Sequence, residues 1–120
     1  MRFKQLGIVV AALVALVGCL LLTPSAGAQG SNYSYQQVTV STSAVSIAAA
    51  TLSGKRGCVL RVESDSIRYR QDGTAPTSSV GMPIAAGEVM EVDSVTDLVQ
   101  AQFIRSGSGD ATLNVACWRQ

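Results

Sequence analysis

Short stretches of this chain alternate apolar and polar residues at every second position, and this period constrains the fold more than any other feature. Cys58, Leu60 and Val62 share one face of an extended stretch, while Arg61 and Glu63 share the opposite face. The same alternation returns near the end of the chain. Because successive side chains of a strand point to opposite sides of a sheet, this pattern is typical of strands with one buried face.

Turn-forming residues separate these stretches. Clusters rich in Gly, Ser and Asp recur at 53–57, 64–66, 72–73, 86–87 and 106–110. Segments spaced about 8 to 12 residues apart in this way predict seven or eight short strands. We therefore expect an all-β fold, either a small antiparallel β-sandwich or a jelly-roll-like barrel. Strands are expected over 44–49 and 98–104, and no helix is expected over 35–120, although the alanines at 48–50 permit one.

The start of the chain has the layout of a bacterial secretory signal. Two basic residues precede an apolar run over 6–22, and Ala26 and Ala28 then form a small-residue cleavage site. Cleavage after Ala28 would leave Gln29 as the new N-terminus. The chain is thus predicted to divide into a signal peptide over 1–28, a short tether over 29–34 and a β-sandwich domain over 35–120.

Two other fates of this N-terminal segment remain open. Residues 16–19 resemble a lipobox, in which Cys19 would carry the lipid and become the first residue. An uncleaved membrane anchor is the third alternative. We expect an exported protein of the periplasm, cell surface or extracellular space, which is held on a membrane only if Cys19 is lipidated.

The cysteines agree with export. Removal of the signal leaves Cys58 and Cys117, and such a pair most often forms a disulfide in an oxidising compartment. Closing a loop of this length stabilises a fold by roughly 4 kcal/mol on chain-entropy arguments. The alternative is two buried, unpaired thiols.

Charge and residue types argue against several functional classes. Two of the nine basic residues lie in the predicted signal, so seven basic groups remain against eight acidic ones. This balance gives no broad attraction to nucleic acid. The chain has no histidine, which is the commonest general base and metal ligand. We expect no metal, no cofactor and no enzymatic activity, with Asp65 and Asp72 capping turns and Glu88 and Glu91 keeping an edge soluble.

Three arginines are the most suggestive polar residues. Arg68 and Arg70 project from the same strand face, and Arg61 is expected on a neighbouring strand. Together they would grip a phosphate, a sulfate or a carboxylated sugar. The alternative is a set of structural contacts with the carboxylates of Glu63 and Asp72, which would hold the loop after Arg70 in place.

Aromatic side chains and one loop supply further candidate contacts. Tyr33 and Tyr35 alternate near the tether, and Trp118 is expected to face away from the core. They are candidates for binding a sugar or a peptide, the alternative being packing at the edge of the core. The polar loop over 74–80, which contains Thr77, is the best-placed contact surface because loops carry most binding residues.

The stretch over 68–77, R-Y-R-Q-D-G-T-A-P-T, is followed by G-M-P-I over 81–84. Together with the last strands it resembles a family of small, poorly characterised bacteriophage-encoded β-sandwich proteins that share an R-Y-R-x-D-G-T-x-P-T core. The likeness spans 38–119 and implies a virion-associated protein without enzymatic activity. This chain adds a signal peptide and a cysteine pair to the family pattern.

These observations predict a non-enzymatic structural or interaction module of a phage particle or a bacterial surface, exported and held by a disulfide. We expect a protein partner or self-association. The alternative is a periplasmic or surface module that binds anionic glycans, with Arg61, Arg68, Arg70, Thr77 and Trp118 as candidate binding residues.

Overall fold

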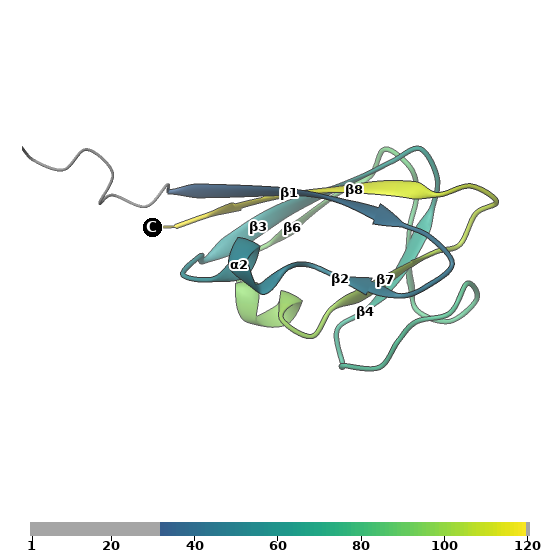
Figure 1. Ribbon diagram of the computed structural model, residues 1–120, viewed down its shortest axis with the longest axis horizontal. Coiled ribbons are helices and arrows are strands. Elements are labelled where there is room, and N and C mark those ends of the chain that lie inside the picture. The colour runs from purple at the N-terminus through teal and green to yellow at the C-terminus, as the bar shows by residue number, and fades with distance from the viewer. Residues whose placement is uncertain (1–31, 120) are drawn as a thin grey trace, which may run out of the picture. The chain divides into compact units, whose positions relative to one another are not determined.

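The computed structural model describes residues 32–119, which form two four-stranded antiparallel sheets (Figure 1). The first sheet holds β1 (Tyr33–Val40), β8 (Ala111–Trp118), β3 (Gly57–Glu63) and β6 (Val89–Val92), in that order. The second holds β2 (Val45–Ser46), β7 (Gln102–Arg105), β4 (Ile67–Arg70) and β5 (Met82–Ile84). The predicted signal peptide, the possible lipid site at Cys19 and the start of the tether lie outside the described residues.

The strand pairing follows the order of a jelly roll. β1 pairs with β8, β2 with β7, β3 with β6, and β4 with β5, so the chain forms one long antiparallel ribbon. The β3–β8 and β4–β7 pairings then wrap this ribbon into two stacked sheets. The eight strands found over residues 32–119 confirm the expected all-β fold.

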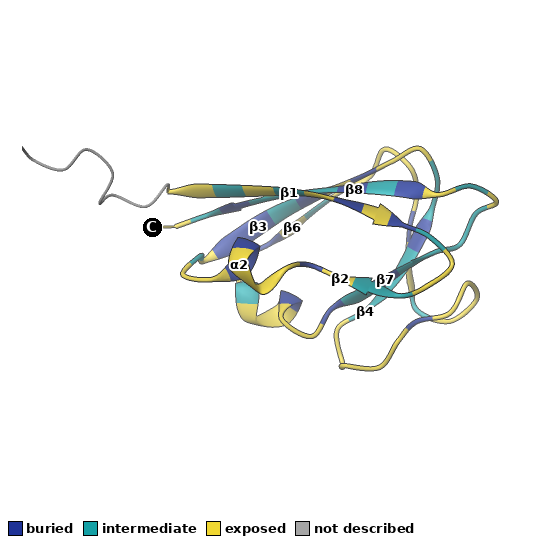
Figure 2. Ribbon diagram, in the orientation of Figure 1, coloured by how far each residue is buried: buried dark blue, intermediate teal, exposed yellow. Residues whose placement is uncertain are grey.

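Every second residue of the long strands points into the space between the sheets, as the alternation predicts. Leu60 and Val62 of β3 and Leu113 of β8 are buried there (Figure 2). Phe103 of β7 faces them from the second sheet, and Tyr69 stacks against it with ring centroids 6.1 Å apart. Burying each such side chain contributes roughly 1.5 to 3 kcal/mol, so this layer is the main source of stability.

The predicted disulfide joins Cys58 and Cys117. The two residues face each other directly on β3 and β8, and both are fully buried. The bond thus lies within the first sheet and links its two central strands.

The structure differs from the expected strands where the chain passes between sheets. Residues 98–104 were expected as one strand, but a 3₁₀ turn, η1 (Val95–Leu98), precedes β7, which begins only at Gln102. The N–H of Ala101 donates to the carbonyl of Leu98 at 3.2 Å, which folds the chain back over the buried Leu98. Leu98, which the sequence pattern placed at the start of a strand, is therefore buried by a turn that covers the core.

The second difference concerns the segment between β1 and β3. Only Val45–Ser46 of the expected 44–49 strand pairs, and the alanines lead into one helical turn, α2 (Ala49–Leu52). The side chain of Gln36 holds this turn, since its Oε1 accepts from the N–H of Ala48 at 2.9 Å. No helix within 32–119 is long and apolar enough to cross a membrane.

The first strand is also longer than expected. β1 begins at Tyr33, so Tyr33 and Ser34 belong to the sheet and not to the tether. The N–H of Arg119 donates to the carbonyl of Asn32 at 2.9 Å and extends the pairing with β8 by one residue. Pairing with β8 therefore makes Tyr33 and Ser34 part of the sheet.

Candidate functional site

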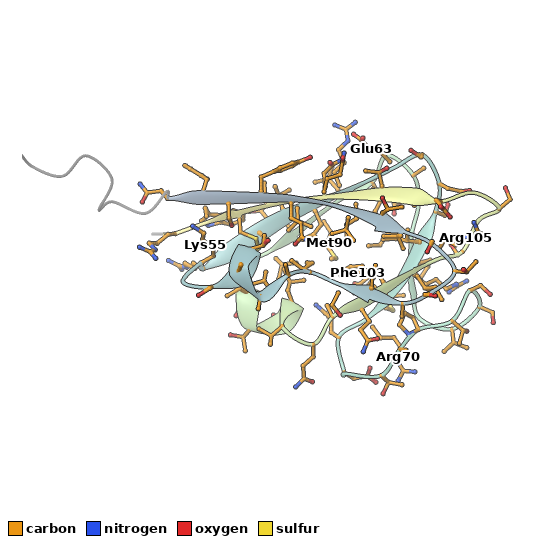
Figure 3. The ribbon with its side chains drawn as sticks, viewed as in Figure 1. Lys55, Glu63, Arg70, Met90, Phe103 and Arg105 are labelled. Atoms are coloured by element: carbon orange, nitrogen blue, oxygen red, sulfur yellow. A yellow bond between two sulfur atoms is a disulfide. The ribbon has the colours of Figure 1, made fainter. Side chains whose placement is uncertain are left out.

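The three candidate arginines do not share a face, which corrects the prediction. Arg61 lies on β3 and projects from the outer side of the first sheet, where its Nε is 3.6 Å from Glu63 Oε1. Arg68 and Arg70 lie on β4 in the second sheet. Figure 3 shows Glu63 and Arg70 on opposite sides of the sandwich. The reason is the turn over 64–66, where the chain crosses from one sheet to the other.

Arg68 holds the loop that follows β4. Its Nε donates to the carbonyl of Ser78 at 3.1 Å, and its Nη1 donates to the carbonyl of Gly81 at 2.8 Å. These two oxygens lie near the end of the loop that the sequence singled out as a contact surface. Two N–H donors of the Arg68 guanidinium therefore hold the loop, and these donors are not available to a bound anion.

Arg70 forms a two-point contact with Asp72. Its Nε donates to Asp72 Oδ1 at 3.1 Å and its Nη2 to Asp72 Oδ2. Asp72 Oδ1 also accepts from the N–H of Thr74 at 3.2 Å. The Arg70 guanidinium, followed by this N–H, holds the pKa of Asp72 below its ordinary value. The arginine–carboxylate contact expected between Arg70 and Asp72 is thus present, and it holds the chain after Arg70.

An open hollow of about 430 Å³ lies beside this pair. Tyr69, Arg70 and Asp72 line one part of it, and the exposed side chains of Val80 and Met82 line another. The wall is thus mainly apolar, with one arginine whose charge a carboxylate already balances. A ligand bound here would be held by apolar contact more than by charge.

Thr77 lies apart from Arg70, in a second hollow of about 430 Å³ that also contains Pro76, Ile104 and Arg105. The Thr77 hydroxyl accepts from the N–H of Val80 at 2.9 Å, which shapes the loop. Thr77 and Arg70 therefore line different hollows.

Asp65 joins two loops that are distant in sequence. Its Oδ1 accepts from the N–H of Ser66 and its Oδ2 from the N–H of Gly109, both at 2.7 Å. These contacts, with Gly109 the stronger, lower the pKa of Asp65. A turn-capping role was predicted for Asp65, but no sequence signal indicated its partner across the β7–β8 loop.

Trp118 and two tyrosines belong to the outer face of the first sheet. Trp118 lies between Tyr33 and Gly57 in the strand register. Its ring covers Gly57, because a Cβ at that position would come within 2.6 Å of Trp118 Cζ2. Tyr35 is 64% exposed, and its hydroxyl donates to Asn114 Oδ1 at 2.5 Å. Trp118 thus faces away from the core, as expected.

Sequence reasoning missed the polar and apolar neighbours of these aromatics. Gln37 donates from Nε2 to the same Asn114 Oδ1 at 3.1 Å, and Val89 is 58% exposed on β6. The register places Gln37, Asn114, Arg61 and Val89 in one row across the four strands. Such a row becomes visible only once the strand pairing is known.

No family model, curated protein or solved structure matches the chain. Among residues 32–119, no three side chains of the metal-binding types come together.

Proposed function

We propose that this protein is a non-enzymatic structural or interaction module of a phage particle or a bacterial surface. The outer face of the first sheet carries the proposal. There Tyr33 and Tyr35 on β1 and Val89 on β6, the two edge strands of this sheet, expose 71%, 64% and 58% of their surface. Sites for small molecules are concave, whereas a sheet face with exposed aromatics suits contact with another protein.

Contacts elsewhere support the same function. Arg68 and Arg70, the strongest candidates for gripping an anion, donate to the loop after β4 and to Asp72. The buried Cys58–Cys117 bond suits an oxidising compartment outside the cytoplasm. Jelly rolls occur in viral capsid proteins and in lectins, so the fold is compatible with a particle protein without requiring one.

The test uses protein expressed from the full-length gene in its natural background. The exported fraction is analysed by native mass spectrometry and by intact mass without reductant. We expect a chain that begins at Gln29, carries the disulfide and is found in a discrete complex. The substitution Tyr35→Glu should remove that complex, because it places a charge on the outer face of the first sheet.

The matched control is Met82→Glu, which changes an equally exposed apolar residue on the second sheet. It should leave the complex intact. A protein that stays in the cytoplasm, or a complex that Tyr35→Glu does not affect, would contradict the proposal.

One observation favours the ligand-binding alternative, namely the hollow that contains Arg70 and Tyr69. Because the rest of the wall is mainly apolar, a sulfated oligosaccharide would depend on Arg70 for its charged contact and would compete there with Asp72. Its binding would therefore weaken with rising salt and disappear in Arg70→Gln. The control Arg61→Gln, on the opposite face, would retain it. Salt-dependent binding with this pattern would favour the glycan-binding module, and its absence would favour the interaction module.

A further inference from the structure

The two sheets have four edges, and three of them are poorly suited to pairing with another strand. β2 has two paired residues, β5 has three including Pro83, and β6 has four including the exposed Glu91. Short strands, proline and charged side chains are the usual means by which proteins protect an open edge. β1 is different, because it forms an edge with eight residues.

β1 also lacks the usual protection in its sequence. Its residues, YSYQQVTV, include neither a charge nor a proline. The bond from the N–H of Arg119 to the carbonyl of Asn32 shows that these two residues form a hydrogen-bonded pair of the β1–β8 ladder. In an antiparallel ladder such pairs recur at every second residue. Even-numbered residues therefore turn their main-chain groups toward β8, and Tyr35, Gln37 and Thr39 turn theirs toward the open edge.

The neighbouring helical turn does not satisfy these main-chain groups. α2 is bound through inward-pointing side chains of β1: Ser34 Oγ donates to the carbonyl of Thr51 at 2.6 Å, and Gln36 Oε1 accepts from the Thr51 hydroxyl at 3.0 Å. These contacts secure the inner side of β1 and leave its edge to another strand.

We propose that β1 pairs with β1 of a second copy of this chain about a two-fold axis, joining two first sheets into one continuous sheet. This inference rests on the proposed interaction function and names the partner. An antiparallel two-fold pairing presents the same donors and acceptors from both sides, so the edge is complementary to itself.

Side chains and charge fit a second copy. In the register that pairs Tyr35 of one copy with Gln37 of the other, Tyr33 lies opposite Thr39, and aromatic–Thr neighbours stabilise paired strands. β1 brings no charge into this contact. The described domain has seven basic and eight acidic residues, so two copies repel each other little.

The first test is sedimentation velocity over a range of concentrations, with protein expressed from the full-length gene. We expect the wild-type protein to form a dimer and Gln37→Pro to be a monomer, because proline removes an N–H directed at the open edge. The matched control is Glu91→Pro. The bond from Val62 N–H to the Glu88 carbonyl indicates that the Glu91 N–H also faces an open edge, that of β6. This variant should remain a dimer.

A charge pair tests the two-fold symmetry without altering the backbone. Gln37→Lys and Gln37→Glu should each weaken the dimer by roughly threefold to tenfold, since the two copies of residue 37 lie diagonally across the two-fold axis, where long charged side chains reach each other. Mixing the two variants should restore association, because each then meets the opposite charge.

Three results would overturn the inference: a wild-type monomer at every concentration, a dimer that survives Gln37→Pro, or a mixture no stronger than either charged variant alone. A wild-type monomer that still enters a larger complex, and loses it with Tyr35→Glu, would overturn the β1 pairing and leave the proposed function standing.

Discussion

Arg68 donates from two nitrogens to the main-chain carbonyls of Ser78 and Gly81, while Arg61 lies on the opposite face, 3.6 Å from Glu63 and well exposed. The two arginines carry the same charge but contribute very differently to stability. A guanidinium that bonds to main-chain oxygens limits the motion of a whole loop, whereas an exposed ion pair contributes little.

We therefore expect Arg68→Gln to lower the free energy of unfolding by about 1 to 2 kcal/mol, because hydrogen bonds from a charged group are lost. Arg61→Gln should change it by less than about 0.5 kcal/mol. Urea unfolding measures both variants, and hydrogen exchange should increase over the loop at 74–81 in Arg68→Gln alone. Equal effects of the two substitutions would contradict the role given to Arg68.

Asp65 gives the protein a stability that depends on pH. Its pKa is lowered in the folded state, so its contribution is fully present above the ordinary carboxyl pKa of about 4 and is lost as pH falls through the folded-state value. We expect thermal stability to fall over this acidic range and to fall less in Asp65→Asn. Asp72, whose pKa is also lowered, accounts for part of the remaining slope. An unchanged slope in the Asn variant would contradict this contribution.

For individual residues, the sequence predicted the direction of a side chain more reliably than it predicted the atoms that the side chain contacts. The period of two placed Arg61, Arg68 and Arg70 outward, and all three do project from outer faces. It could not show that the turn at 64–66 transfers the chain to the other sheet. The partner of Asp65 on the β7–β8 loop was equally hidden, because 44 positions separate Asp65 from Gly109.

Among the elements, β3 and β8 were the most predictable, since strict alternation and a buried face coincide in both. The segment over 98–104 misled because Ala101 and Phe103 are buried two positions apart, as in a strand, whereas Leu98 is buried by the turn that precedes β7. Hydrophobic period alone does not separate these two structures in a short segment.

Gly57 is where β3 tolerates no side chain. A Cβ there would lie 2.7 Å from the carbonyl oxygen of Val92 and 2.6 Å from the Trp118 ring. We expect Gly57→Ala to cost about 1 to 3 kcal/mol, as overpacking does, and to shift the fluorescence of Trp118, the one tryptophan of the chain. In the control Gly87→Ala the added Cβ meets no atom within 4 Å, so the fluorescence should stay unchanged, although the φ of +87° strains an alanine and lowers stability. If Gly57→Ala changed neither the free energy of unfolding nor the fluorescence, the Trp118 ring would not cover this position.

For the whole molecule, the sequence predicted a two-sheet β fold but did not distinguish the jelly-roll order from other sandwiches. That order depends on β1 pairing with β8 and β2 with β7, across most of the domain. Turn residues mark where strands end, but they do not say which distant strand is the neighbour.

The disulfide is the strongest single constraint on the whole fold. Replacing both Cys58 and Cys117 with alanine should lower the free energy of unfolding by about 4 kcal/mol, because the unfolded chain regains the freedom of a loop of 59 positions. Urea unfolding without reductant measures the loss. The wild-type protein in excess reductant should match the double variant once unfolded and refolded. A double variant as stable as the oxidised protein would contradict this account.

The position of β8 has a consequence for how the protein is made. β8 lies between β1 and β3, yet the ribosome produces it after both of them. Until residues 111–118 have been synthesised, neither β1 nor the β8 side of β3 has its partner, and Cys58 has no Cys117 to bond with. The first sheet therefore forms late in synthesis. A chain following the proposed export route would reach the secretion channel before it has folded, in a state that can pass through the channel.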